Sequence, residues 1–386
     1  MAVVAVAEAV AAAAGWGAPN RGALRTALDS AVARIKSGPD WAALSFYNDL
    51  QIPKMDTVTL EQPGHFTHSG TTPPQAPGPG EVLVRVLMVG VCGTDLHAFE
   101  GTQPFFSYPR VLGHELAVEV IETGEGVEGF RPGDRCAVNP YLTCGVCAAC
   151  TRGRSNCCAK MCVIGVHTDG GMRDRILLPA KQMYKCEKLP NVQIPLVETL
   201  GVGIHAVGRS GVVPRERAIV VGAGPIGLSV IEFLKLEGAE IGVVEKMPER
   251  LEFAARHHGL KRFYPSQEEA RQEEPSMLVF DCTGSRESME QSIQLLQQGG
   301  KLIFVGIVND HVSLFDPDLH RREATILASR NSTPAEHHRV LDLMESGRVD
   351  VTAWPTECAP RAIMHERFPA WLHREAGIVK AVIDWS

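Results

Sequence analysis

Arg217-Ala-Ile-Val-Val-Gly222-Ala-Gly224-Pro-Ile-Gly227 is a short apolar run that ends in three glycines spaced G-x-G-x-x-G. The run predicts a strand, and Pro225–Glu237, which Gly238 stops, predicts a helix directly after it. The first glycine permits a tight turn, the second lets backbone approach a pyrophosphate, and the third lets helix and strand pack closely. The helix N-terminus favours the phosphate charge. We therefore expect a dinucleotide-binding loop formed by Gly222, Gly224, Pro225, Ile226 and Gly227; a tight turn without a ligand is the less favoured interpretation.

From about residue 200 onward, the chain repeats this alternation of strand and helix. Glu240–Glu245, Met277–Asp281 and Lys301–Gly306 are further strand-like segments, which indicates a doubly wound parallel sheet of the α/β class. Thr333-Pro334-Ala335-Glu336 is a strong helix start, with an N-cap threonine, a proline at the first position and a glutamate at the third.

Glu245 ends the second predicted strand and favours one cofactor over the other. A carboxylate at this place accepts hydrogen bonds from ribose hydroxyls and repels a 2′-phosphate. Lys246 and Arg250 follow closely and soften that repulsion. We expect Glu245 and Arg250 at the cofactor, with NAD favoured over NADP.

The composition is that of a globular protein long enough for two domains. The chain has 386 residues, of which 45% are hydrophobic and 22% charged. Its net charge of −7 argues against nucleic acid or an anionic membrane as a partner, and no apolar run is long enough to span a bilayer. Its 11 cysteines are an odd number, and five lie between Cys144 and Cys158, which favours metal thiolates in a cytoplasmic protein.

The first half of the chain lacks this alternation of strands and helices. Residues 1–54 contain apolar residues at helical spacing between 23 and 35 and are expected to form a helical N-terminal extension, with a packing or oligomer-contact helix as the alternative. Residues 71–80 are rich in proline and glycine and predict a turn or linker. Glu81–Val91 and several short runs over residues 111–140 predict strands of a β-rich unit.

Cys144-x2-Cys147-x2-Cys150-x7-Cys158 is the most specific pattern in the sequence. Four thiolates on one compact loop close a tetrahedral structural zinc site. An iron–sulfur cluster is the competing interpretation, but ferredoxin runs continue with a three-residue gap and a proline, whereas Ala159 follows here. Cys157 would shift the register by one residue, and Cys162 is a further substitute ligand.

A second set of metal ligands precedes this loop. Cys92-Gly-Thr94-Asp95-Leu-His97 follows a predicted strand, and Gly113-His114-Glu115 comes about twenty residues later. Cysteine and histidine are the ligands of a catalytic zinc that keeps one position open.

These two blocks, the four-cysteine run and the glycine loop together resemble the zinc-containing medium-chain dehydrogenases, within them the sorbitol dehydrogenase-like branch. The resemblance covers roughly residues 75–386. It implies a GroES-like β-rich catalytic domain, assigned to residues 55–198 and 346–386, and a Rossmann domain over 199–345. It also implies two zinc ions per chain and a homodimer or homotetramer.

The resemblance assigns roles position by position. Cys92 and His114 match catalytic zinc ligands, and Glu115 matches the adjacent acid that is a ligand in some members. Val197-Glu198-Thr199-Leu200 resembles a segment whose glutamate approaches the metal, although Thr199 stands where the family often has proline. Glu115 and Glu198 are therefore alternative or exchanging third ligands.

The remaining matches to the family concern residues that transfer the substrate proton and residues that line the nicotinamide site. Thr94 matches the hydroxyl residue that receives the substrate proton, and His97 matches a histidine that relays it to solvent. Asp95 is expected to orient the ligand histidine. Cys282 and Thr283, in Asp281–Gly284, match the segment that lines the nicotinamide.

The expected activity is transfer of a hydride from a small secondary alcohol, such as a polyol or sugar acid, to NAD. A threonine- or aldehyde-directed relative and a non-catalytic nucleotide-binding zinc protein are the alternatives. The intact set of Cys92, His114 and Thr94 argues against the non-catalytic alternative.

Overall fold

The computed structural model describes residues 54–104, 106–373 and 377–386. The chain divides between Lys54 and Met55, and Met55–Ser386 form one unit. The predicted N-terminal extension, up to residue 53, lies outside the described residues. Within the described part of the chain, no helix has the length and hydropathy needed to cross a membrane.

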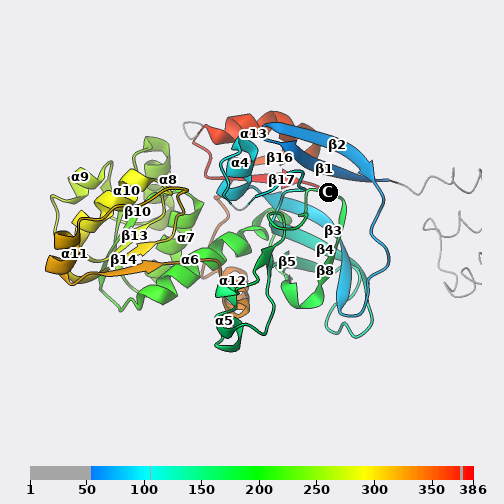
Figure 1. Ribbon diagram of the computed structural model, residues 1–386, viewed down its shortest axis with the longest axis horizontal. Coiled ribbons are helices and arrows are strands. Elements are labelled where there is room, and N and C mark those ends of the chain that lie inside the picture. The colour runs from blue at the N-terminus through cyan, green and yellow to red at the C-terminus, as the bar shows by residue number, and fades with distance from the viewer. Residues whose placement is uncertain (1–53, 105, 374–376) are drawn as a thin grey trace, which may run out of the picture. The chain divides into compact units, whose positions relative to one another are not determined.

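The glycine loop belongs to a six-stranded parallel sheet with the order β12-β11-β10-β13-β14-β15. We call this sheet with its helices the coenzyme domain; it lies on the left of Figure 1. Its strands are β10 (Arg217–Val221), β11 (Glu240–Val244), β12 (Arg262–Tyr264), β13 (Ser276–Asp281), β14 (Leu296–Phe304) and β15 (Thr325–Ala328). Its helices are α7 (Pro225–Leu236), α8 (Pro248–His258), α9 (Gln267–Ala270), α10 (Arg286–Gln291) and α11 (Asp316–Arg322).

The predicted strands of this sheet are present; β11 and β13 differ from the prediction by one residue at one end, and β14 differs more. The strand expected over Lys301–Gly306 begins at Leu296 and ends at Phe304. Its register with β13 shifts between the pairs Ser276–Leu296 and Leu278–Lys301, because the extra residues on β14 form a bulge. Gly299 within this bulge has a positive φ of 74°.

The domain that the resemblance predicts to be catalytic is built on a mostly antiparallel sheet with the order β16-β17-β3-β4-β5-β9, to which β8 adds by pairing with β3. Its strands are β3 (Glu81–Gly90), β4 (Glu115–Thr123), β5 (Arg135–Val138), β8 (Arg175–Pro179), β9 (Met183–Lys185), β16 (Pro355–Pro360) and β17 (Lys380–Asp384). Two hairpins, β1 (Met55–Gln62) with β2 (His65–Thr71) and β6 (Tyr141–Leu142) with β7 (Cys162–Val163), complete the β structure. Its helices are α4 (Gly93–Glu100), α5 (Ala148–Thr151) and α13 (Met364–Leu372).

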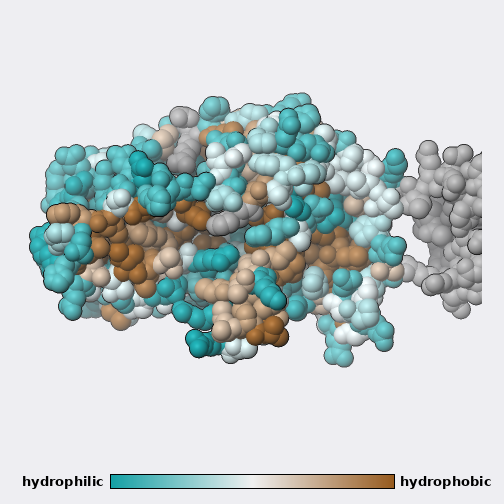
Figure 2. Space-filling view, viewed as in Figure 1, coloured by the Kyte–Doolittle hydropathy of each residue, from teal (hydrophilic) through white to brown (hydrophobic). Residues whose placement is uncertain are grey.

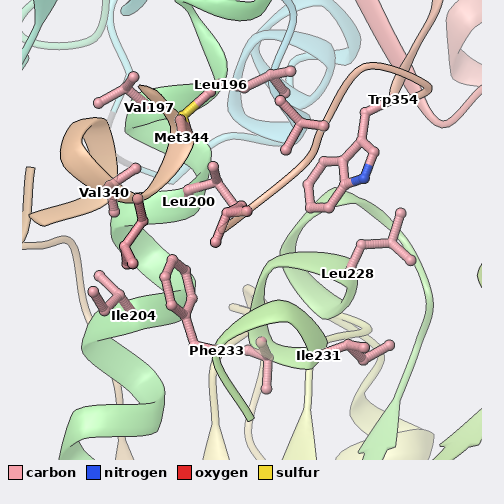
Figure 3. Close-up of a cluster of buried hydrophobic side chains, with 14 of the residues drawn as sticks. Leu196, Val197, Leu200, Ile204, Leu228, Ile231, Phe233, Val340, Met344 and Trp354 are labelled. Atoms are coloured by element: carbon pink, nitrogen blue, oxygen red, sulfur yellow. The ribbon is translucent and has the colours of Figure 1, made fainter. Parts of the chain in front are cut away.

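Two helices connect the domains. α6 (Leu196–Ser210) and α12 (Pro334–Glu345) pack on each other, and α6 also packs on α7. α12 begins with the predicted capping box of Thr333 and Glu336. Figure 3 shows the side chains between these helices, among them Leu200, Leu228 and Val340, all inaccessible to solvent. The core of the coenzyme domain therefore continues into the connecting helices.

We predict that Leu228→Ala lowers the free energy of unfolding by about 2–5 kcal/mol, because it leaves a cavity in this fully buried core. Urea denaturation followed by circular dichroism measures the change. Val213→Ala, at a side chain 55% exposed, is the matched control and is expected to change stability by less than about 0.5 kcal/mol. Equal effects of the two substitutions would contradict the assignment of the core.

Candidate metal centre and cofactor cleft

Strand register brings three distant parts of the sequence to one place. Gly90 at the end of β3 pairs with Glu115 at the start of β4, and on its other side with Val382 of β17. Cys92 lies two residues after Gly90, and Lys380 is the first residue of β17. Glu115 lies across Gly90, where a Cβ atom would be 2.1 Å from its Oε2, so only glycine leaves room for the carboxylate.

Cys92, His114 and Glu115 form one cluster of metal-ligating groups. One ligand atom from each lies within 4.8 Å of the other two. Cys92 is the N-cap residue of α4, and its backbone N–H donates to Asp95 Oδ2 at 2.9 Å. The other oxygen of Asp95 is 3.6 Å from His114 Nδ1, where it can orient the imidazole as the sequence predicted.

The electrostatics of His114 show how strongly charged this cluster is. Burial lowers the pKa of this imidazole, but Asp95 and Cys92 outweigh burial and raise it well above the ordinary value. His114 Nδ1 and Asp95 Oδ1 are both buried without a hydrogen bond. A cation between the thiolate, imidazole and carboxylate would balance the negative charge, and sulfur, nitrogen and oxygen donors are the ligands that zinc takes. The cluster therefore fits a zinc ion.

Glu115 is also held by two residues outside the cluster. Lys380 Nζ donates to Glu115 Oε1 at 2.6 Å and also contacts Oε2, and Thr199 Oγ1 donates to Oε1 at 3.0 Å. Burial lowers the pKa of Lys380, but Glu115 and Cys92 outweigh it and raise the pKa above its ordinary value. Lys380 is thus a buried ammonium paired with a buried carboxylate.

Glu198 lies in the first turn of α6, beside this cluster but not in it. Its carboxylate is not within 4.8 Å of all three ligand atoms. Instead, Tyr141 donates its hydroxyl hydrogen to Glu198 Oε1. Burial raises the pKa of Glu198, and the nearby His114 charge acts against this rise.

The four cysteines of the second pattern also converge. Cys144, Cys147, Cys150 and Cys158 place their sulfurs within 4.8 Å of one another, while Cys157 and Cys162 are not in the group. Backbone N–H groups of Ala159 and Cys150 donate to Cys147 and lower its thiol pKa to about 6. A low thiol pKa favours the thiolate form, which is the form that binds metal. These residues, on the loop that we call the four-cysteine lobe (residues 143–161), fit a closed zinc site.

The glycine loop has the geometry that a phosphate-binding turn requires. Gly222 has a φ of 93°, in the left-handed region. A Cβ on Gly227 would lie 1.8 Å from Gly222 O, so α7 can approach the loop only with glycine there. Gly224 is the N-cap residue of α7, and Pro225 and Ile226 form its first turn.

Glu245 is buried at the end of β11 and contacts this loop. Its carboxylate accepts hydrogen bonds from the backbone N–H of Ala223 at 2.8 Å and of Met247 at 2.9 Å. Arg250, on α8, donates to Ile378 O at 3.2 Å and so contacts the catalytic domain.

A single cleft of about 520 Å³ joins the two sets of residues. From the catalytic domain it is lined by Cys92, Leu96, His97, Glu115 and Lys380, and from the coenzyme domain by Gly222, Gly224, Pro225, Ile226, Glu245, Arg250, Cys282 and Thr283. An alcohol near the metal cluster and a dinucleotide on the glycine loop would share this cleft, as hydride transfer requires.

The predicted proton path is only partly assembled. His97 lines the cleft, has a side chain 48% exposed, and its Nδ1 is 3.1 Å from Thr102 Oγ1. Thr94 is half-buried in α4 and does not line the cleft. Among the described residues, no hydrogen bond joins Thr94 to His97, so a substrate or water would have to connect them.

Comparison with known proteins identifies the family. The model for an alcohol dehydrogenase GroES-like domain matches residues 78–191, and the model for a zinc-binding dehydrogenase matches residues 225–346. L-galactonate-5-dehydrogenase of Escherichia coli K12 is 35% identical over 338 residues, which are 86% of this chain and 99% of the relative. The chain belongs to the zinc-binding alcohol dehydrogenases.

Two solved structures share the fold of this dehydrogenase and hold a cofactor. The RspB alcohol dehydrogenase of E. coli CFT073 with NADH has a TM-score of 0.80 and 25% identity, covering 86% of this chain and 100% of that one. A zinc-binding dehydrogenase of Sinorhizobium meliloti 1021 bound to NADP has a TM-score of 0.78 and 28% identity, covering 86% and 99%. The predicted fold class, a GroES-like domain with a Rossmann domain, is confirmed. The protein is a zinc-binding oxidoreductase with a nicotinamide cofactor and a small-molecule alcohol substrate.

Three residues of this dehydrogenase site did not emerge from the sequence as site residues. Lys380 is the first residue of a short C-terminal strand, and no local pattern relates it to Glu115. Thr199 was noted as a departure from proline, without its hydrogen bond to Glu115. Tyr141 gave no signal, because nothing in a sequence relates a tyrosine before the lobe to an acid 57 residues later.

Proposed function

We propose that this dehydrogenase oxidises a secondary alcohol of a sugar acid and transfers the hydride to NAD. The cleft that joins the Cys92–His114–Glu115 cluster to the glycine loop carries this proposal, because it provides for metal, alcohol and dinucleotide together. Similarity to L-galactonate-5-dehydrogenase over nearly the whole relative supports a sugar acid as substrate.

In the proposed site, Cys92, His114 and Glu115 hold the catalytic zinc, and Glu198, the alternative acid, lies beside them hydrogen-bonded to Tyr141. Zinc, when bound, supplies a Lewis acid that lowers the pKa of a coordinated alcohol. Asp95, with Oδ1 3.6 Å from His114 Nδ1, orients the imidazole through its charge, and Lys380 holds the carboxylate of Glu115 by a hydrogen bond. Thr94 accepts the substrate proton and His97, exposed at the cleft, passes it to solvent.

The proposed cofactor site uses the glycine loop for the pyrophosphate, Arg250 for phosphate charge, and Cys282 and Thr283 beside the nicotinamide. Thr283 is fixed for this, since its N–H and hydroxyl both donate to the buried Asp281 Oδ1, at 3.0 and 2.6 Å. The carboxylate of Glu245 accepts hydrogen bonds from the ribose hydroxyls. NAD is preferred over NADP because a 2′-phosphate would meet this buried carboxylate.

We also propose that the protein forms a homodimer or homotetramer and is located in the cytoplasm. We propose the domain division predicted above, with residues 55–198 and 346–386 in one domain and residues 199–345 in the other. β15 is the edge strand of the coenzyme sheet, and Ile307, Phe315 and Ile326 near it are 62%, 68% and 40% exposed. Figure 2 shows hydrophobic surface, in brown, on the side of the coenzyme sheet where the orange strands of Figure 1 lie. Covering these apolar side chains by a second copy would stabilise an oligomer. None of the 11 cysteines, all of which lie in the described part of the chain, forms a disulfide, as expected in a reducing compartment.

We predict that metal analysis of the purified protein finds about two zinc ions per chain. Cys92→Ala is expected to retain about one, held by the lobe. A single ion in the unmodified protein, or two in the variant, would contradict the two-site proposal.

We predict that NADH forms most rapidly with aldonates in a screen that also contains polyols, threonine and other amino alcohols. Cys92→Ala should lower kcat/KM by at least about a thousandfold, because several kcal/mol of transition-state stabilisation depend on the metal. Cys358→Ala, at an exposed cysteine of β16, is the matched control. Faster turnover of polyols or threonine than of aldonates would contradict the proposal that the substrate is a sugar acid.

We predict that Glu245→Ala weakens NAD binding about tenfold or more, because the ribose hydroxyls lose a charged hydrogen-bond acceptor. NADP binding should weaken less, because the substitution also removes the charge that repels the 2′-phosphate. Isothermal titration with each cofactor measures both constants. Glu240→Ala, at an exposed acid that begins the same strand, is the control. An unchanged ratio of the two affinities would disprove the discriminating role of Glu245.

A further inference from the structure

Tyr141 lies at the base of the four-cysteine lobe. β6, which begins with Tyr141, pairs with β7, and this short ladder closes the chain around residues 143–161. Only two residues separate Tyr141 from Cys144, the first ligand of the lobe. The position of Tyr141 is thus tied to the same hairpin that holds the four sulfurs together.

The backbone and ring of Tyr141 are fixed on several sides. Its N–H donates to Asn139 Oδ1 at 2.9 Å, and its carbonyl oxygen accepts from Gln182 Nε2 at 3.0 Å. The ring packs in a small apolar cluster with Val163 and Val166, on the β7 side of the lobe. A side chain restrained in this way holds its hydroxyl at one place.

That hydroxyl donates to Glu198 Oε1, and both side chains are buried. Glu198 lies in the first turn of α6, next to Thr199, which donates to Glu115, and the charges of His114, Glu115 and Lys380 all act on its carboxyl group. A carboxylate so close to a bound cation would be drawn toward it. The hydrogen bond from Tyr141 provides the opposing attraction, away from the three ligands.

We propose that Tyr141 is a positioning residue that ties Glu198 to the base of the four-cysteine lobe and keeps this acid off the catalytic metal. The open coordination position, which the substrate alcohol needs, is thereby protected. The proposal rests on the proposed function only in that the Cys92–His114–Glu115 cluster holds a metal. It assigns to the lobe hairpin an effect on the catalytic centre in addition to stability.

Removal of the hydroxyl has a definite physical consequence. Phenylalanine leaves the buried carboxylate of Glu198 without its hydrogen bond, and an unpaired buried charge costs several kcal/mol. Within its reach, the metal is the strongest compensating charge. Glu198 then becomes an additional ligand, which retains the metal and competes with substrate.

The test compares Co²⁺-loaded Tyr141→Phe with the Co²⁺-loaded unmodified protein. The d–d absorption is expected to change, and release of the catalytic ion to a chelator to slow about tenfold. Because the four cysteines are unchanged, the lobe contributes equally to both spectra and cancels in their difference. Tyr184→Phe, at a second buried tyrosine that stacks on His337, is the matched control and should leave the spectrum unchanged.

Two further variants keep the test decisive. Tyr141→Phe with Glu198→Gln should restore the original spectrum and release rate, because the amide is a poor ligand. Glu198→Gln alone, which leaves the hairpin intact, should change neither. An unaltered spectrum in Tyr141→Phe, a change that persists in the double variant, or a change in Glu198→Gln alone would each overturn the proposal. Neither readout needs substrate or NAD, so failure of the sugar-acid proposal would leave this result standing.

Discussion

The buried ion pair between Lys380 and Glu115 is the interaction on which the arrangement of the catalytic domain depends. Taking one charge out of water costs several kcal/mol, and only an opposite charge in good geometry offsets it. Lys380 comes from the last strand of the chain and Glu115 from the middle of the catalytic domain, so β17 must lie beside β3 and β3 beside β4. That register also carries Cys92 and His114 to the same point.

The connecting helix α6 fixes the position of the metal centre relative to the cofactor loop. Its first turn places Glu198 and Thr199 beside the charged cluster, while its later turns lie in the core with α7 and α12 (Figure 3). Gly203 lets α7 approach closely, since a Cβ there would be 1.9 Å from Ser229 Oγ. α6 therefore links the metal centre directly to the core beneath the cofactor loop.

The four-cysteine lobe contacts this same helix at a second place. Asn156 in the lobe lies 3.0 Å from His205 Nε2 of α6 and donates to Arg330 O of the coenzyme domain at 3.0 Å. Tyr141 at the base of the lobe reaches Glu198 in the first turn of α6. The lobe is therefore attached to the helix that spans the two domains, near its beginning and along its length.

Local sequence was sufficient where short-range rules act. The strand, turn and helix around Gly222–Gly227 could be predicted because the glycines, the helix start and the apolar run are all close in sequence, and the capping box of Thr333 and Glu336 followed in the same way. The cysteine spacing likewise indicated one compact group of sulfurs. Resemblance then added the pairing of Cys92 with His114.

Tertiary structure alone decided what surrounds the two acids. The sequence left Glu115 and Glu198 as equal candidates, and the difference between them comes from partners 265 and 57 residues away, Lys380 and Tyr141. Such contacts depend on strand register and on the packing of a helix against a hairpin, which local patterns do not encode. The sequence determined which groups can bind a metal and a dinucleotide, whereas the fold determined which partner holds each acid, because charge pairing in a buried site depends on distance in space.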